Sequence, residues 1–124
     1  MTINTLEALF IHDLSDVYSA EKQITRALPK MARAATDENL VEAFKLHLEE
    51  TRGQIDRLDE LVEKTDGISI KRMKCHALER LVEEAQEIID SVDVGQVRDA
   101  GLIGAAQKVE HYEIAAYGTL HAMA

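Results

Sequence analysis

Apolar residues recur at alternating steps of three and four along most of this chain, the spacing that places them on one face of an α-helix. The pattern predicts four helices, over about residues 4–35, 38–64, 75–91 and 97–124. The one proline, Pro29, falls inside the first helix, where we expect it to bend the helix or to leave a carbonyl near residue 25 unpaired. The pattern therefore predicts an all-α fold.

The connections between these helices indicate how they are arranged. Thr36 and Asp37 lie in a short turn, and either is a good N-cap for the next helix, so the first two helices should form an antiparallel pair. Residues 66–96 are long enough to cross back along the bundle, and they include the irregular stretch "ISIKRMK" and the short third helix. One long crossover is typical of ferritin-like four-helix bundles.

A bundle of this kind needs a fourth long helix, which is apparently missing from this chain. We expect residues 1–124 to form a single ferritin-like helical domain that is truncated at its C-terminus. The alternatives are that the short third helix, or another subunit, fills the space.

Polar side chains interrupt the apolar stripes of the three long helices. They are Glu21 on the first helix, His47, Glu50, Thr51 and Gln54 on the second, and Glu110 and Glu113 on the last. On the last helix the stripe is expected to run through Ala100, Ile103, Gln107, Glu110, Ile114 and Tyr117, which places Glu110 in the core and Glu113 one turn further along.

Sequence spacing places three of these carboxylates at one height in the bundle. Glu21 lies about 15 residues before the first turn and Glu50 about 14 residues after it, and Glu110 lies about 14 residues beyond the start of the last helix. At about 1.5 Å per residue, each carboxylate is roughly 21 to 23 Å from the same end of the bundle. Buried ionised carboxylates cost several kcal/mol each unless they are paired or bind a cation. The spacing therefore predicts one polar layer that a cation would stabilise.

A layer rich in carboxylates favours iron or manganese. Dinuclear bundles use one Glu from each of two helices and a Glu-x-x-His from each of the others, and Glu110 and Glu113 have that spacing with a carboxylate in place of the imidazole. The predicted ligands are Glu21, Glu50, Glu110 and Glu113, with His47 and Gln54 as weaker candidates. The alternatives are that single glutamates reach solvent at the edge of a stripe, that His47 is a hydrogen-bonded core histidine, and that Gln54 supports a polar layer.

Composition limits the partners and the compartment. The net charge of −9 argues against nucleic acid and anionic membranes, and no apolar run is long enough to span a bilayer. The N-terminus lacks the basic region of a signal peptide, and the single cysteine fits a reducing compartment, so we expect a cytoplasmic protein. Cys75 lies beside the basic run "KRMK", which could lower its pKa, although a passive thiol is the expected state.

Four stretches of the chain are similar to the YciF/YciE family of bacterial stress-response proteins, within the ferritin-like superfamily. They are "YSAEKQITRALPKMARAA", "HLEETRGQIDRL", "IKRMKCHALERLVEEA" and "VRDAGLIGAAQKVEHYEIAAYGTL". The resemblance implies a cytoplasmic homodimer with a carboxylate site of the di-iron type and a fourth long helix that brings further carboxylates. The ferritin-like motif expects a histidine three residues after Glu50, where this chain has Gly53. Glu113 resembles the extra carboxylate of rubrerythrin-type sites.

Two functions follow from these observations. The first is a metal-binding stress protein with a dinuclear iron or manganese centre, which, if catalytic, would act as a ferroxidase or reduce peroxide. The second is a metal-free homodimeric helical scaffold or interaction protein, in which the polar layer confers specificity of packing.

Overall fold

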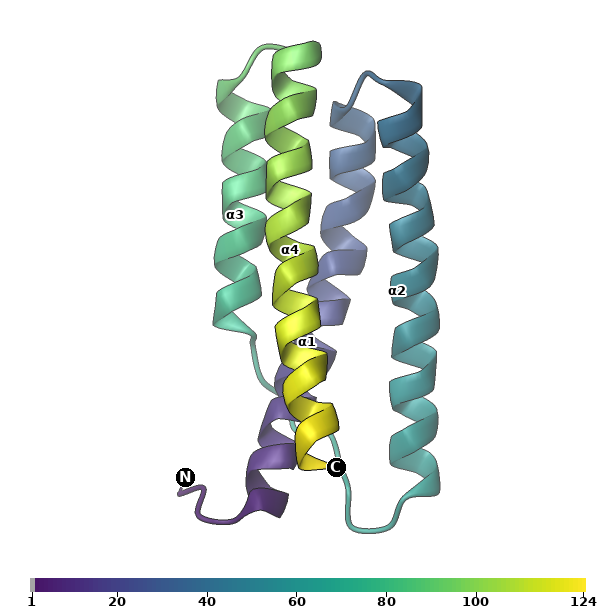
Figure 1. Cartoon of the computed structure of the whole chain (residues 1–124), viewed down its shortest axis with the longest axis vertical. Helices are drawn as coiled ribbons and strands as arrows, with labels where there is room; N and C mark the ends of the chain where they lie inside the picture. Colours follow the sequence, from purple (N-terminus) through teal and green to yellow (C-terminus); the bar gives the residue numbers. More distant parts are fainter. Residues whose placement is uncertain (1) are drawn as a thin grey trace.

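Four α-helices and their connections make up the computed structural model, which describes residues 2–124 (Figure 1). They are α1 (Leu6–Ala34), α2 (Glu38–Lys64), α3 (His76–Ser91) and α4 (Gln96–Met123). Every predicted helix boundary is correct to within two residues, and the all-α fold is confirmed. None of the described helices is both long and apolar enough to cross a bilayer.

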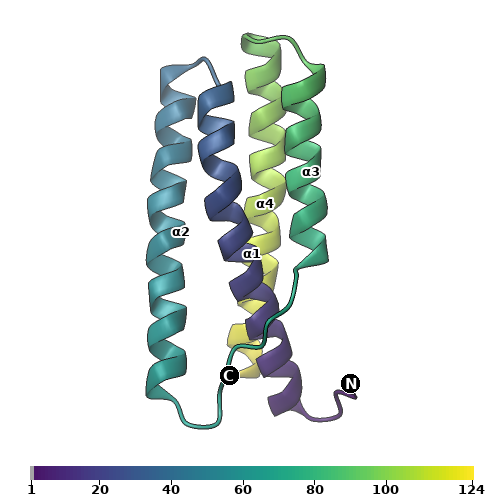
Figure 2. The same ribbon diagram turned by 180° about the vertical axis from the view of Figure 1, so that it is seen from behind.

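The helices follow the order expected of a bundle with one long crossover. α1 and α2 are antiparallel, residues 65–75 then pass across α1 to reach α3, and α4 runs parallel to α2 (Figures 1 and 2). α1 packs against all three other helices, whereas α3 packs on α1 and α4. α3 lies on the side of α4 that is away from α2, so it does not fill the space between those two helices (Figure 1).

α1 is the central helix, and its predicted stripe is buried. Its apolar side chains divide between two core clusters, one around Ile24 and Leu102 and the other around Leu14 and Leu120. Glu21 lies on the same stripe between these clusters and is 0% exposed. A buried polar layer, made up of Glu21 on α1, Thr51 on α2 and Glu113 on α4, therefore separates two apolar halves of the core.

The turn between α1 and α2 is tied to α4 by a carboxylate that the sequence did not single out. Asp37 caps α2 by accepting hydrogen bonds from the backbone N–H groups of Asn39 and Leu40, which settles the choice between the two predicted caps. Asp99 of α4 accepts from the backbone and the hydroxyl of Thr36, at 2.9 and 2.7 Å, and from the backbone of Asp37 at 2.9 Å. These hydrogen bonds, those from Thr36 above all, lower the pKa of Asp99.

The predicted stripe of α4 is wrong in phase. Ile103 and Ile114 are 44% and 68% exposed, and Glu110 is exposed rather than directed into the core. The buried residues are Asp99, Leu102, Ala105, Val109, Glu113 and Leu120. Apolar residues are spread around the whole of α4, so periodicity does not decide which side packs. The contacts of α4 with α1 and α3 bury the residues just named. The predicted stripe instead faces the space beside α2, where no described helix packs.

A candidate metal site in the carboxylate layer

Most of the predicted ligands surround one cleft between α2 and α4. The cleft has a volume of about 370 Å³. Its walls are formed by His47, Glu50, Gln54, Glu110, Glu113, Ile114 and Tyr117. Five of the six predicted ligand residues thus line a single cavity, and the sixth, Glu21, is buried close to Glu113 and Tyr117. The fold therefore brings side chains from three helices to one level.

Glu21 is the most unusual group in this layer. Its side chain has no exposed surface, and neither of its carboxylate oxygens makes a hydrogen bond. The side-chain oxygens of Gln54 and Tyr117 are also buried without a partner. Nearly all buried polar groups in native proteins are hydrogen-bonded, and each one that is not costs about 1 to 3 kcal/mol. Four such atoms in one region indicate a place suited to a ligand, an ion or ordered water.

Burial sets the protonation of Glu21. Loss of hydration is the main cause that raises its pKa, and the neighbouring carboxylate of Glu113 adds to it, so the pKa reaches about 9 although the Tyr117 hydroxyl acts in the opposite direction. Burial, followed by the nearby Glu21, also raises the pKa of Tyr117. Without a cation, both groups are therefore neutral at neutral pH.

Glu113 and His47 form an ion pair beside this neutral carboxyl. The imidazole Nε2 lies 3.1 Å from a carboxylate oxygen of Glu113. Burial acts to raise the pKa of Glu113, but the hydrogen bond with His47 and the proximity of Glu21 outweigh it, and the pKa is lowered. The same hydrogen bond raises the pKa of His47 against the effect of burial, with help from the negative charges of Glu113, Glu110 and Glu50. The layer thus holds an ionised Glu113 between a protonated Glu21 and His47, whose protonated form Glu113 favours.

The positions of the other candidates differ from the simplest expectation. Glu50 and Glu110 are exposed at the mouth of the cleft, and Gln54 is half-buried. Gly53 stands three residues after Glu50, where a Glu-x-x-His motif would need a histidine, and no imidazole replaces it on that turn of α2. Among residues 2–124, no three His, Cys, Asp or Glu side chains are already grouped closely enough to hold one metal ion. The structure therefore supplies the nucleus of a site rather than a complete set of ligands.

Cys75 belongs to a separate buried chain of polar groups. Its sulfur lies 3.0 Å from the Tyr112 hydroxyl, which donates to Asp16 at 3.1 Å. Burial raises the pKa of the thiol, and the hydrogen bond with Tyr112 offsets this only in part. The basic run before Cys75 does not activate it, so the expectation of a passive thiol is confirmed. No sequence spacing could have revealed the contact between residues this far apart in the chain.

Comparison with known proteins agrees with this fold. The family model described as "Domain of unknown function (DUF892)" matches residues 5–124. Protein YciF of Escherichia coli (strain K12) is 61% identical over 124 residues, which are the whole of this chain and 75% of YciF.

Two solved structures are similar to this one. The crystal structure of the E. coli stress protein YciF matches with a TM-score of 0.94 and 61% identity, over 98% of this chain and 76% of that one. YcfI from Rhodopseudomonas palustris, described as "a putative structural protein", matches with a TM-score of 0.90 and 47% identity over the same shares. The chain therefore belongs to the DUF892 family and is a close relative of the E. coli stress protein YciF.

Proposed function

We propose that this protein acts in a bacterial stress response by binding iron or manganese in the carboxylate layer between α1, α2 and α4. The observation that carries the proposal is the state of Glu21, a completely buried carboxyl with two unpartnered oxygens next to the ionised Glu113. A carboxyl that is kept protonated by its surroundings becomes a metal ligand when a cation displaces the proton. A divalent ion would satisfy both oxygens and offset the cost of burying the charge.

The donors available suit these metals. Glu21 and Glu113 provide buried carboxylates, and His47 provides the one nearby imidazole. Glu50 and Glu110 at the mouth of the cleft are further carboxylates, enough for the dinuclear centre that the helical arrangement favours. When bound, two such ions would supply redox chemistry of the ferroxidase or peroxide-reducing kind.

The chain's own groups would prepare the site for this chemistry. The hydrogen bond from the Thr51 hydroxyl to the His47 carbonyl, at 2.8 Å, fixes the turn of α2 that carries the imidazole. The contact between His47 Nε2 and Glu113 lowers the pKa of Glu113 and keeps this carboxylate ionised until a cation arrives. Tyr117 remains a neutral phenol beside Glu21, so it adds no negative charge to the layer.

A metal-free scaffold is the second candidate, and one observation favours it. The layer can balance its charges without an ion, since Glu21 is neutral and Glu113 is paired with His47. A buried polar layer between two apolar clusters can serve to fix one packing arrangement, here within a homodimeric stress protein. The description of YcfI as a structural protein points in the same direction.

Titration calorimetry with Mn(II) on the metal-free protein, repeated anaerobically with Fe(II), separates these functions. Because Glu21 must lose a proton to become a ligand, we expect saturable binding with release of about one proton per Glu21 at neutral pH, detected by using buffers of different ionisation enthalpy. Glu21→Gln should abolish both the binding and the proton release, and the exposed control Glu63→Gln should retain them. Absence of saturable binding of either ion to the wild-type protein would leave the scaffold as the function.

A further inference from the structure

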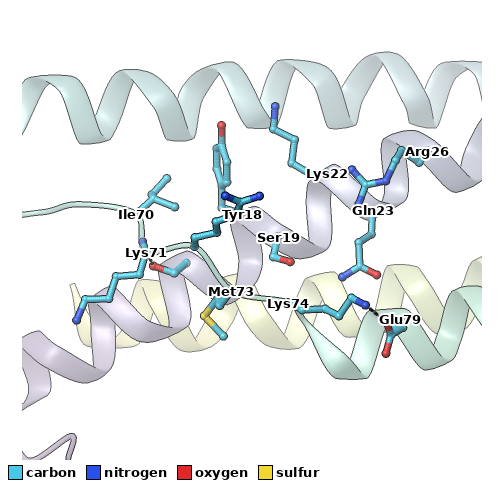
Figure 3. Close-up of a pocket in the computed structure, with 12 residues that line it drawn as sticks. Tyr18, Ser19, Lys22, Gln23, Arg26, Ile70, Lys71, Met73, Lys74 and Glu79 are labelled. Carbon is cyan, nitrogen blue, oxygen red and sulfur yellow. Dashed lines mark hydrogen bonds and ion pairs between the residues drawn. The ribbon is translucent and has the colours of Figure 1, made fainter. Parts of the chain in front are cut away.

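A second cavity lies away from the carboxylate layer and has the opposite charge. It is a groove of about 780 Å³ between α1 and the segment of residues 70–74 (Figure 3). Five cationic side chains line it, and they are Lys22, Arg26, Lys71, Arg72 and Lys74. The chain has only 14 Lys and Arg against 23 Asp and Glu, so more than a third of its cations are gathered here in a protein of net charge −9. We call this cavity the basic groove.

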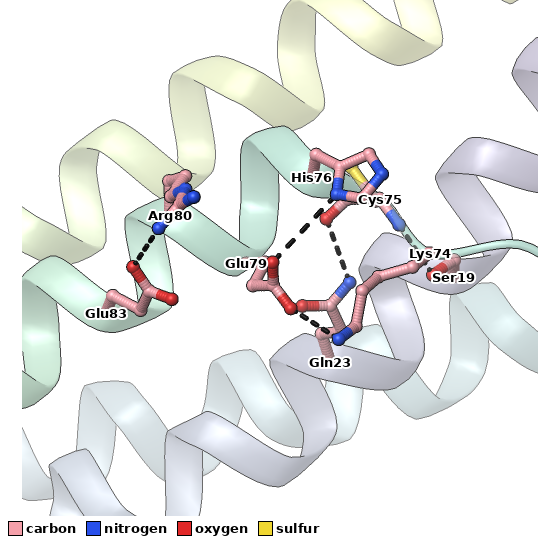
Figure 4. A network of polar contacts seen from close by, with 8 residues as sticks. All are labelled: Ser19, Gln23, Lys74, Cys75, His76, Glu79, Arg80 and Glu83. Carbon is pink, nitrogen blue, oxygen red and sulfur yellow. Dashed lines mark hydrogen bonds and ion pairs between the residues drawn. The ribbon is translucent and has the colours of Figure 1, made fainter.

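The single acidic residue in the lining does not cancel this charge. Glu79 is paired with Lys74, whose ammonium lies 2.6 Å from its carboxylate, and this contact lowers the pKa of Glu79 (Figures 3 and 4). Among the residues that the structure describes, neither Arg26 nor Arg72 forms an ion pair, and Lys22 lies over the ring of Tyr18 at 5.4 Å from its centroid. Arg26 and Arg72 therefore bring positive charge to the groove that no ion pair among the described residues neutralises.

Hydrogen bonds between α1 and residues 71–75 hold the walls of the basic groove in place. The hydroxyl of Ser15 accepts from the backbone N–H of Lys71 at 2.8 Å, and that of Ser19 accepts from Cys75 at 3.0 Å. The side-chain amide of Gln23 donates to the Cys75 carbonyl at 3.1 Å (Figure 4). Anchoring at both ends of the 71–75 segment fixes the backbone that carries the cationic side chains of one wall relative to α1. This is the preorganisation that favours binding of a ligand.

The groove also has an uncharged part. Tyr18, Ile70 and Met73 contribute aromatic and apolar surface between the cations (Figure 3). Burial raises the pKa of Tyr18, and the neighbouring Asp59 of α2 adds to this, so the phenol stays neutral. The volume falls within the range of roughly 300 to 1,000 Å³ that is usual for small-molecule sites, which combine such surface with a few convergent charges.

We propose that the basic groove binds a compact organic phosphate of about nucleotide size, with Arg26, Arg72 and Lys22 holding the phosphates and Tyr18 and Met73 contacting the organic part. Guanidinium groups bind phosphate through paired hydrogen bonds, and a cleft of one charge raises the local concentration of ions of the other. A long polyanion such as a nucleic acid is disfavoured because it would leave the groove and meet the acidic remainder of the surface.

The test measures binding of ATP, tripolyphosphate and adenosine to the full chain at low ionic strength by calorimetry, with amide NMR shifts to locate the site. We expect one equivalent of ATP to bind, tripolyphosphate to bind more weakly and adenosine not to bind, with shifts concentrated in residues 70–74. The double variant Arg26→Gln, Arg72→Gln should weaken ATP binding about tenfold or more. Tyr18→Leu should weaken binding of ATP but not of tripolyphosphate.

Controls keep the proposal falsifiable. Arg80 is an exposed arginine on α3, paired with Glu83 outside the groove, and Arg80→Gln should bind ATP as the wild type does. Arg26 and Arg72 are both exposed, so their replacement should leave the urea midpoint unchanged. No saturable ATP binding, equal losses in the Arg80 variant, or equal affinity for ATP and tripolyphosphate would each overturn the proposal. Dissociation of a dimer by the double variant would instead assign the groove to a second copy of the chain.

Discussion

Replacing Glu21 by glutamine should stabilise the metal-free protein, by an amount that depends on pH. The folded state holds a proton on Glu21 up to a pKa of about 9, whereas the unfolded chain releases it near the ordinary value of 4.5. Between these values the native state binds more protons than the unfolded state, so the free energy of unfolding falls as pH rises. Below about pH 4.5 and above about pH 9 this contribution no longer changes. Glutamine does not titrate, so the variant does not lose this stability as the pH rises.

The size of the effect follows from the two pKa values. A pH of 7 lies about 2.5 units above the pKa of 4.5 that the carboxyl has in the unfolded chain. At 1.36 kcal/mol per unit, keeping Glu21 protonated in the folded state costs about 3 kcal/mol of stability at this pH. The difference in unfolding free energy between Glu21→Gln and wild type should therefore grow by about 3 kcal/mol between pH 4.5 and pH 7. Any hydrogen bond that the amide gains or lacks is the same at every pH and cancels from this change.

Urea unfolding in the presence of a chelator, at about one-unit steps from pH 4.5 to pH 8.5, measures the effect. The matched control Glu63→Gln, at an exposed position of α2, should track the wild type at every pH. A stability difference for Glu21→Gln that does not change with pH would show that Glu21 is ionised in the folded state, and the reasoning about the layer would be refuted.

Three further predictions test other parts of the account. Because Cys75 is buried and its pKa is raised, a thiol reagent at about pH 8 should label it only after urea unfolding, and rapid labelling of the native protein would contradict this. A Cβ at Gly101 would lie 2.8 Å from the side chain of Ile88, so Gly101→Ala should lower the free energy of unfolding in urea by about 1 to 3 kcal/mol. A Cβ at Gly104 would meet open space, so the control Gly104→Ala should raise the free energy of unfolding by up to about 1 kcal/mol. Asp99→Asn should lower the urea midpoint at neutral pH, because the folded state stabilises the ionised Asp99. The two midpoints should approach each other as the pH falls and Asp99 of the wild type becomes protonated, and equal midpoints at neutral pH would contradict this.

The sequence was sufficient to predict the helices and the level of the polar layer. On α1 the apolar stripe is narrow, so its phase is unambiguous and Glu21 could be placed in the core correctly. The N-cap of α2, limited by the sequence to Thr36 or Asp37, and the irregular segment before α3 also follow from local chemistry, which acts over a few residues. Local signals of this kind do not depend on which helices meet.

The remaining features depend on contacts between helices. α4 has apolar residues on all sides, so only its packing against α1 and α3 shows that Glu113 is buried and Glu110 is not. The pairing of Glu113 with His47 and the approach of Tyr117 to Glu21 join residues that lie far apart in the sequence. The same holds for the hydrogen bonds that Asp99 accepts from the first turn, which have no periodic signature.

The central claim is that Glu21 and Glu113 are ligands of one metal centre, and anomalous diffraction from crystals soaked in Mn(II) tests it most directly. The account predicts an anomalous peak between these two carboxylates, at ligand distance from both, that is lost in Glu21→Gln crystals soaked in the same way. A fully soaked crystal with no peak in the layer, in which Glu21 remains without a cation, would contradict the claim.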